Sequence, residues 1–459
     1  MLFNSYQFIA FFLPIALIGY YYAADNRQLR LGWLLLTSLC FYAYWDWRFL
    51  PLLLASIIIN WLLSRRIGFN SPRLLVSFGI GFNLLLIGVF KYLDFLGSSL
   101  AYAADTAYTP IGLILPLGIS FFTFQQISYL LDKSRNQAPD YSLLDYAVYV
   151  SFFPQLIAGP IVRHSEIIPQ YHKSPRRPDI YHHIGAGLVL FALGLAKKTL
   201  IADELATTAT PLFDLASAGQ TLSLGEAWSG AFTYSLQLYY DFSGYSDMAI
   251  GLGLMFGLQF PVNFNAPYRA TDIRDFWRRW HMTLSRFLRD YLYIAMGGNK
   301  HGQTRLLCAL LVTMLLGGLW HGAGWTFVIW GGLHGLALVV HRGWSSKVTM
   351  PSWLGWIMLA LFLAFTWVLF RAPDLTTAVA IWQSMLGLNG FDIQRLDSST
   401  LNFCAAVFLL AIFGPTSQKL ITYSLRPRRI YAVMTSLFIF YLTLNIANDG
   451  YTEFLYFQF

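Results

Sequence analysis

The stretch LLGGLWHGAGWTFVIWGGLHG, Leu315–Gly335, combines the pattern of a membrane-spanning helix pair with two histidines. From Leu306 to His341 the sequence contains no Asp, Glu, Lys or Arg. An apolar run of about 20 residues is long enough to cross a bilayer as a helix. The stretch therefore predicts two helices within a membrane, and it raises the question of why His321 and His334 stand there.

The glycines of this stretch have a structural explanation, and His321 does not. Gly318 and Gly322 form a GxxxG pair, and so do Gly331 and Gly335. Small residues at this spacing allow helix backbones to approach closely in a membrane. A neutral imidazole inside a bilayer needs hydrogen-bond partners, and polar groups there are costly and often functional. Because its ordinary pKa lies near 6.5, histidine is suited to proton transfer at neutral pH.

The other two histidines of the region are interpreted as packing or interface residues. His334 and His341 share a helix face two turns apart. They lie 13 and 20 residues after His321, so neither would stack beside it on a continuous helix.

Composition extends the membrane interpretation to the whole chain. Of 459 residues, 56% are hydrophobic and only 12% are charged, whereas soluble domains carry about 25% charged residues. The apolar runs are continuous, unlike the alternating strands of a β-barrel. The three cysteines lie far apart and predict neither a disulfide framework nor a metal site. We expect an all-α polytopic membrane protein, one membrane domain over 1–459, with about 11 transmembrane helices.

The basic charges are attributed to membrane topology. The net charge is +8, and positive residues concentrate in the cytoplasmic loops of membrane proteins. This explanation is preferred to nucleic-acid binding. It places the N-terminus outside and residues 132–140 in the cytoplasm, with loops expected at 97–110 and after residue 200. Spans are expected near 6–24, 31–45, 49–64, 74–96, 111–131, 182–200, 227–245, 306–322, 325–341, 351–370, 400–415 and 430–448.

The segment DYAVYVSFFPQLIAGPIVR departs from this alternation, because basic residues flank it on both sides. Pro154, Gly159 and Pro160 interrupt it. A re-entrant segment at about 141–162 would keep both basic clusters inside, and broken backbone survives at membrane depth only where protein or water covers it. The alternative is an ordinary proline-kinked span.

The most charged region is RATDIRDFWRRWHMTLSRFLRDYLYIAMGGNKHG, within 269–305. Asp272 is expected to cap a helix whose aromatic residues form a stripe, as in an amphipathic helix at the cytoplasmic interface. The arginines could serve only as a membrane anchor, or they could attract a phosphate-bearing donor such as a coenzyme A thioester. On spacing alone, His281 at the edge of the stripe is interpreted as a hydrogen-bonded structural residue.

A third polar stretch, LQLYYDFSGYSDMAIGLGL, carries Asp241 and Asp247 within an apolar span. Carboxylates there are functional candidates with a partner, either a basic residue such as Lys91 or a histidine. A purely structural role in joining helices is equally open. No Gly-rich phosphate loop, metal cluster or Ser–His–Asp set stands out in the sequence.

Taken together, several stretches resemble the membrane-bound O-acyltransferase (MBOAT) family, in particular its bacterial branch typified by the alginate O-acetyltransferase membrane subunit. The resemblance covers nearly the whole chain. The stretches are SFFTFQQISYLLD, SFFPQLIAGPIVRHSEIIPQ, YYDFSGYSDMAIGLGLMFG, NFNAPYRATDIRDFWRRWHMTLSRFLRDYLYIAMGGNKHG, LLGGLWHGAGWTFVIWGGLHG and the terminal FLYFQF.

The resemblance implies a bundle of about 11 spans, with re-entrant and interfacial helices, around a central funnel or tunnel. His321 corresponds to the defining histidine of the family. His281 corresponds to its second characteristic polar residue, which reverses the interpretation from spacing alone. Arg278, Arg279, Arg286 and Trp280 are then candidates for the acyl-donor side. Candidate supporting polar residues are Asp241, Asp247, Gln125 and Gln126.

The implied function is O-acetyl transfer in a bacterial inner membrane. Acetyl-CoA from the cytoplasm is the expected donor substrate, and no metal or permanently bound cofactor is expected. The acceptor is expected to be an extracytoplasmic polysaccharide such as alginate, cellulose or peptidoglycan, reached directly or through a periplasmic acetyltransferase partner. His321 would act as general base, and His281 would hold or polarise the reacting groups. The alternatives are a transporter or channel without acyl-transfer chemistry, and a scaffold for secretion partners.

Overall fold

Helices form every regular element in the part of the chain that the structure describes. The computed structural model describes residues 1–68, 73–300, 302–345, 348–391, 398–421, 429–449 and 452–455. The predicted all-α class is confirmed over these ranges. The last four residues of the terminal FLYFQF lie outside them.

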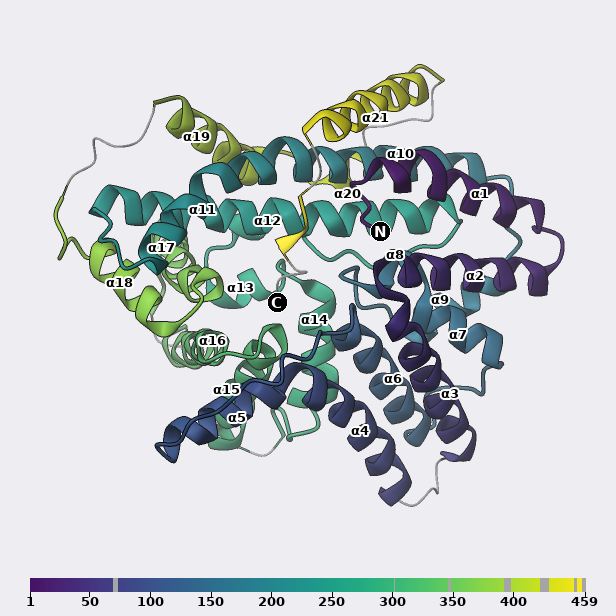
Figure 1. Cartoon of the computed structure of the whole chain (residues 1–459), viewed down its shortest axis with the longest axis horizontal. Helices are drawn as coiled ribbons and strands as arrows, with labels where there is room; N and C mark the ends of the chain where they lie inside the picture. The colour runs from purple at the N-terminus through teal and green to yellow at the C-terminus, as the bar shows by residue number, and fades with distance from the viewer. Residues whose placement is uncertain are drawn as a thin grey trace. The chain divides into compact units, whose positions relative to one another are not determined.

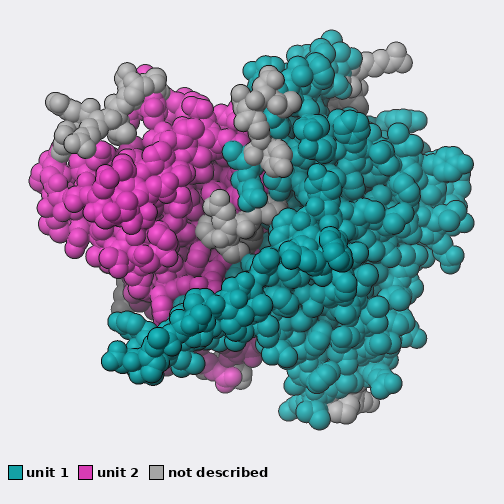
Figure 2. All heavy atoms as spheres, in the orientation of Figure 1, with its two compact units in different colours: residues 1–195, 245–261, 421–453 teal, residues 196–244, 262–420, 454–459 magenta. Residues whose placement is uncertain are grey.

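The chain forms two compact units, which are coloured separately in Figure 2. Unit 1 comprises residues 1–195, 245–261 and 421–453, and unit 2 comprises 196–244, 262–420 and 454–459. The long helix α12, Leu224–Met255, contributes to both units.

Unit 1 contains the first half of the chain and one late helix. Short 3₁₀ or π segments link several of its α-helices, and the α-helices are labelled in Figure 1. Its elements are η1 Phe8–Phe12, α1 Leu13–Tyr22, α2 Arg27–Asp46, η2 Trp47–Phe49, α3 Leu50–Arg66, α4 Arg73–Ile87, η3 Gly88–Tyr92, α5 Leu93–Ala103, α6 Ile119–Ser134, α7 Leu143–Ser151, α8 Phe153–Leu156, α9 His164–Ile167, η4 Ile168–His172, α10 Ile180–Ala196 and α21 Arg429–Asp449.

The segment predicted to be re-entrant is a broken helix within unit 1. Helix α7 ends at Ser151, and Phe152 adopts ψ 114 before the single turn of α8. Backbone from Ile157 to Val162 is not helical and is buried. The break agrees with the expectation from Pro154, Gly159 and Pro160, because proline removes a backbone donor. That the segment is re-entrant stays a prediction.

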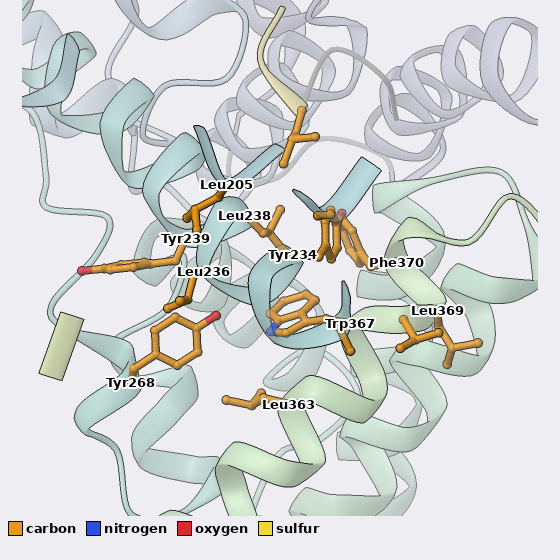
Figure 3. Packing of buried hydrophobic residues seen from close by; sticks show 14 of the residues in the cluster. Leu205, Tyr234, Leu236, Leu238, Tyr239, Tyr268, Leu363, Trp367, Leu369 and Phe370 are labelled. Carbon is orange, nitrogen blue, oxygen red and sulfur yellow. The ribbon is translucent and has the colours of Figure 1, made fainter. Parts of the chain in front are cut away.

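Unit 2 contains the remaining helices and the candidate active site. Its hydrophobic core joins α11, α12, α17 and α18, and Figure 3 shows part of this packing around Trp367 and Tyr268. Its elements are η5 Lys197–Ala202, α11 Asp203–Ser217, the first part of α12, η6 Pro267–Arg269, α13 Ile273–Trp277, α14 Met282–Phe287, η7 Leu288–Tyr293, α15 Gln303–His321, α16 Trp325–Trp344, α17 Ser352–Arg371, α18 Leu375–Met385, α19 Ser398–Phe413 and α20 Ser417–Lys419.

Helices α15 and α16 form a tight hairpin, as the two GxxxG pairs predicted. Gly318 and Gly331 face each other: a Cβ on Gly318 would lie 3.0 Å from the Cα of Gly331 and would collide with the backbone oxygen of Phe327. A Cβ on Gly331 would collide with the backbone oxygen of Met314. Because only hydrogen occupies these positions, the two backbones touch directly.

Several helices have the length and apolar character of membrane spans. Five described helical runs meet both conditions: Arg27–Arg66, Arg73–Ala103, Ile180–Ser217, Gln303–His321 and Ser352–Arg371. Shorter apolar helices are Phe8–Tyr22, Thr400–Phe413 and Val433–Ile446. Large apolar side chains such as Ile18, Leu85 and Leu437 are more than half exposed on these helices, as expected for surfaces that contact lipid. The total of about 11 spans stays a prediction.

Two expected loops are partly helical. The chain remains helical through η5 and continues as α11 to Ser217, although acidic residues led us to expect a loop after residue 200. Two of those acidic residues, Asp203 and Glu204, occupy the first turn of α11, where the helix dipole favours negative charge. Helix α5 likewise runs to Ala103, within the loop expected at 97–110.

Substitution of Gly331 tests the hairpin contact. We expect Gly331→Ala to lower the melting temperature of the detergent-solubilised protein by several degrees, because overpacking costs about 1–3 kcal/mol. Gly343→Ala, on the same helix, is the matched control, since its Cβ would meet nothing within 4 Å. Equal melting temperatures for the two variants would contradict the assignment of a close backbone contact.

Candidate active site

His281 lies in an unusual backbone conformation between α13 and α14. Its φ of 42° and ψ of 53° are left-handed, which costs a non-glycine residue about 1–3 kcal/mol. Two backbone hydrogen bonds fix this turn against the preceding loop: Met282 N–H donates to the Asn263 carbonyl, and Asn265 N–H donates to the Arg279 carbonyl, both at 2.9 Å. The expected single amphipathic helix is therefore wrong, because the chain turns at 278–281.

The side chain of Asn263 fixes the tautomer of His281. Thr283 donates its backbone N–H and its hydroxyl to Asn263 Oδ1, at 3.3 and 2.9 Å. Since a backbone N–H can only donate, the atom facing it is the amide oxygen. His281 Nδ1 lies 3.1 Å from the same oxygen, so Nδ1 carries the proton and Nε2 carries a lone pair.

The ring of His281 is buried among aromatic side chains. Phe242 packs edge-on against it at 4.8 Å between ring centroids. The side chain is fully buried, and this desolvation lowers the pKa of His281 to about 3. Its Nε2 has no hydrogen-bond partner among the described residues. The ring is therefore neutral at physiological pH and presents a hydrogen-bond acceptor.

His321 is the last residue of α15 and lies beside His281. The centroids of the two imidazole rings are 6.4 Å apart. Trp330 and Phe370 pack against His321 at 5.3 and 5.1 Å, and the histidine is 5% exposed. The structure thus brings together two histidines that are 40 residues apart in the sequence. Asn263, whose backbone carbonyl and side-chain oxygen hold Met282 and His281 in place, was not predicted as a site residue from the sequence.

His334 lies on the other side of Trp330. Its ring centroid is 4.5 Å from Trp330, and its Nε2 lies 3.2 Å from Thr366 Oγ1. These contacts fit the interpretation of His334 as a packing histidine that orients Trp330.

A pocket of about 980 Å³ in unit 2 is lined by the predicted arginines Arg278 and Arg286 and by Met282, which follows His281 in the chain. Three further arginines line it that the sequence analysis did not assign to the donor side. These are Arg274, Arg289 and Arg342.

Two of the predicted donor-side residues do not line this pocket. Arg279 forms an ion pair with Asp275, at 2.9 Å. Trp280 is buried in the core of unit 2, where it stacks on Phe276 and packs against Trp367. Both residues belong to the turn at 278–281, and neither is among the residues that line the pocket.

Comparison with known proteins identifies the family. Residues 127–382 match the family model described as MBOAT, membrane-bound O-acyltransferase family. This chain belongs to the membrane-bound O-acyltransferase family. It is 44% identical over 440 residues to the peptidoglycan O-acetyltransferase of Helicobacter pylori, covering 88% of this chain and 83% of the relative. It is 39% identical over 432 residues to the "Probable alginate O-acetylase AlgI" of Pseudomonas aeruginosa, covering 90% and 81%.

A more distant relative is named for the transfer of a different group. The teichoic acid D-alanyltransferase of Streptococcus thermophilus is 28% identical over 243 residues, which is 50% of this chain and 58% of the relative. Together with the apolar helices, MBOAT membership makes this chain a multi-pass membrane protein of an acyltransferase family.

Asp241 forms part of a buried ion cluster in unit 2 of this MBOAT protein. Lys198 Nζ lies 2.9 Å from Asp241 Oδ1 and 2.8 Å from Asp203 Oδ1. The other oxygen of Asp241 accepts the backbone N–H of Leu455 at 3.0 Å. The ring of Phe454 lies 4.9 Å from Lys198 Nζ. Lys198, and not Lys91, is thus the partner of Asp241, and the cluster holds Phe454 and Leu455 against α12.

The remaining polar candidates lie in unit 1. Asp247 is buried on α12. Gln126 donates to Ser56 Oγ at 2.9 Å, and Gln125 is buried on the same helix, α6. These contacts join helices of unit 1, and a role in the reaction stays a prediction. In the described part of the chain, no cluster of His, Cys, Asp or Glu has the composition to hold a metal ion.

The pH dependence of stability tests the neutral state of His281. Below its ordinary pKa near 6.5 the ring takes a proton in the unfolded chain, but the buried ring does so only near pH 3. Between these two pH values the unfolded state binds more protons than the folded state. The His281 ring therefore lowers the free energy of unfolding as the pH falls below 6.5, by up to about 1.4 kcal/mol per pH unit.

Asn263→Asp should weaken that acid destabilisation. A carboxylate beside Nδ1–H favours the charged ring and raises its pKa, so the folded protein would take up the proton as well. We expect melting temperatures in detergent, measured from pH 7.5 to pH 5, to fall less steeply for Asn263→Asp than for the wild type. Asn265→Asp, exposed on the same loop, is the control and should follow the wild type. Parallel curves for all three proteins would contradict the assigned tautomer and charge.

Proposed function

We propose that this protein is a membrane O-acetyltransferase of the bacterial inner membrane. It passes an acetyl group from cytoplasmic acetyl-CoA across the membrane for O-acetylation of an extracytoplasmic polysaccharide, through a periplasmic acetyltransferase partner. The observation that carries the proposal is the buried pair of His281 and His321, with ring centroids 6.4 Å apart, in a chain of the MBOAT family. Relatives named for O-acetylation of peptidoglycan and alginate support a polysaccharide acceptor.

The two histidines have different roles in the proposed reaction. His321 takes the proton of an acceptor hydroxyl while the oxygen of that hydroxyl attacks the thioester carbonyl carbon. A carbon–oxygen ester bond forms, the carbon–sulfur bond breaks, and the leaving thiolate of coenzyme A takes the proton from the imidazolium. The lone pair of His281 Nε2 accepts a hydrogen bond from an O–H or N–H of the bound reactants and holds them beside His321.

The proposed membrane arrangement follows the charge pattern of the sequence. About 11 spans, with the re-entrant segment 141–162 and the amphipathic region 269–305 on the cytoplasmic side, surround a central funnel in one membrane domain. The N-terminus is periplasmic. Arg278 and Arg286 attract the phosphate-bearing end of the donor from the cytoplasm.

Substitution of His321 tests the function. We expect His321→Ala to reduce acetyl transfer by the purified protein at least 100-fold, because general-base catalysis contributes about 10²–10⁴ in rate. Transfer is measured as acetyl-CoA consumption and as acetylated polymer in cells. His182→Ala, at an exposed position, should retain full activity.

Two outcomes would contradict the proposal. Full polymer acetylation by a normally inserted His321→Ala protein would show that the histidine is dispensable, as a scaffold predicts. Movement of a solute without cleavage of the thioester by the wild type would identify a transporter instead.

A further inference from the structure

The ion cluster around Lys198 is a buried polar feature of unit 2 that the proposed reaction does not use. Lys198 Nζ lies 2.9 Å from Asp241 Oδ1 and 2.8 Å from Asp203 Oδ1. Lys198 and Asp241 are each 2% exposed, whereas the side chain of Asp203 is 23% exposed. Taking a charge out of water costs several kcal/mol, and ionisable groups within a membrane protein are functional candidates by default. The buried pair therefore calls for a role beyond stability.

Both partners of the buried pair lie far from the ends of long helical runs. Asp241 is about 25 Å along α12 from Leu224 and about 21 Å from Met255. Lys198 lies within the helical run Ile180–Ser217, in its π-helical segment η5. Segments of π-helix are rare and occur frequently at functional sites. The ion pair thus joins two long helical runs at an interior point, where it can fix the rotation of one against the other.

The turn of α12 that carries Asp241 also carries an aromatic contact to His281. Phe242, the next residue, packs edge-on against the His281 ring at 4.8 Å between ring centroids. Phe264 packs against Phe242 at 5.0 Å. Successive residues of an α-helix differ in direction by about 100°, so the two side chains of this turn reach different neighbours. A rotation of the turn that broke the ion pair would also displace Phe242 from His281.

A backbone donor restrains the carboxylate of Asp241 from a second direction. The N–H of Leu455 donates to Asp241 Oδ2 at 3.0 Å, while Oδ1 faces Lys198. Leu455 itself belongs to the hydrophobic core of unit 2. Because both oxygens of the carboxylate are engaged, the side chain has little rotational freedom. Asp241 is therefore a fixed point for the middle of α12.

The His281 ring depends on packing because a hydrogen bond holds only one of its nitrogens. Asn263 Oδ1 lies 3.1 Å from Nδ1, and Nε2 has no hydrogen-bond partner among the described residues. A single hydrogen bond at one edge leaves the ring able to tilt about that bond. The edge-on contact with Phe242 opposes such a tilt. It thereby fixes the direction in which Nε2 presents its lone pair.

We propose that Asp241 is a positioning residue, whose ion pair with Lys198 fixes the turn of α12 that packs Phe242 against His281. The inference rests on the proposed acetyl transfer and deepens it, because it assigns the buried charges to the geometry of the site. A displacement of about 1 Å at a reacting centre can lower a rate about 100-fold. Loss of the ion pair should therefore lower kcat and leave donor binding nearly unchanged.

Removal of both charges together tests the positioning role. The neutral-pair variant, Lys198→Met with Asp241→Asn, leaves neither partner as an uncompensated buried charge, and the new amide can still accept from Leu455. Neutral replacement of a buried ion pair is often tolerated, so we expect a melting temperature in detergent close to that of the wild type. In purified protein, kcat for acetyl transfer should fall about tenfold and KM for acetyl-CoA should change less than about twofold.

Tyr240→Phe is the matched control on the same turn of α12. Tyr240 Oη donates to the Val407 carbonyl at 3.0 Å, away from His281. Loss of this buried hydrogen bond should lower the melting temperature without lowering kcat. Wild-type kcat in the neutral-pair variant would show that the ion pair is only structural and would overturn the proposal.

A mutant cycle tests whether the ion pair acts through Phe242. Phe242→Leu alone should lower kcat about tenfold, and its addition to the neutral-pair variant should lower kcat by less than about twofold more, because effects on one path are not additive. If the two effects multiplied, the ion pair would act independently of Phe242, and the proposal would be overturned.

Chemical labelling separates this proposal from the proposed function. Diethyl pyrocarbonate modifies accessible neutral imidazoles, and peptide mass spectrometry resolves each histidine. We expect His281 to be labelled about tenfold faster in the neutral-pair variant than in the wild type, because the ring then samples open positions. His334, also buried in unit 2, should stay protected in both proteins.

The labelling outcomes are distinct from the loss of acetyl transfer. Equal labelling of His281 in the two proteins, or faster labelling of His281 and His334 together, would overturn the positioning role. Selective labelling of His281 in the variant of a protein that transfers no acetyl group would overturn the proposed function and leave the positioning role intact.

Discussion

Direct backbone contact between Gly318 on α15 and Gly331 on α16 is the constraint on which the candidate active site depends. The two helices approach so closely that a Cβ on either glycine would collide with backbone of the other helix. This contact sets the offset of one helix along the other, and so it places Trp330 against the His321 ring at the end of α15. The same hairpin forms one side of the arginine pocket. A shift of one turn, about 5.4 Å, would separate His321 from its aromatic neighbours.

The second histidine is held by a different kind of interaction, a single amide oxygen that accepts from three groups. Asn263 Oδ1 lies within hydrogen-bond distance of the His281 ring and of both donors of Thr283. These bonds offset the cost of the left-handed backbone at His281, and they decide which ring nitrogen keeps its lone pair. Position and protonation state are therefore set by the same group. These hydrogen bonds to Asn263 involve no charged group, which suits a buried site where an unpaired charge would be costly.

The features that sequence could predict are those that depend on local pattern. Continuous apolar runs predicted α15, α16 and α17 to within a few residues, and the glycine spacing predicted the helix contact, because both follow from the helical repeat. The spacing of His281 and His321 gave no indication of their proximity, since they meet only through the turn at 278–281. The same turn interrupts the expected amphipathic helix. The turn depends on one left-handed residue, His281, which helix propensity does not reveal. Arg342 was missed because it belongs to an apolar helix and reaches the pocket only through tertiary packing.

In unit 2 the buried lysine is paired with carboxylates, whereas the histidine pair is packed against aromatic rings. Where charge is buried, as at Lys198, it is neutralised by two carboxylates within 2.9 Å, because removing two ions from water costs several kcal/mol each unless they compensate one another. Arg274, Arg278 and Arg342, which form no ion pair with any described residue, line a pocket where water or a phosphate can solvate them. The two histidines are packed against aromatic rings, and desolvation keeps His281 neutral. An arginine close to that ring would add to the penalty on the protonated form of any histidine acting as base. A base that must accept a proton therefore works better among aromatic rings, as at His321, than beside an unpaired cationic side chain.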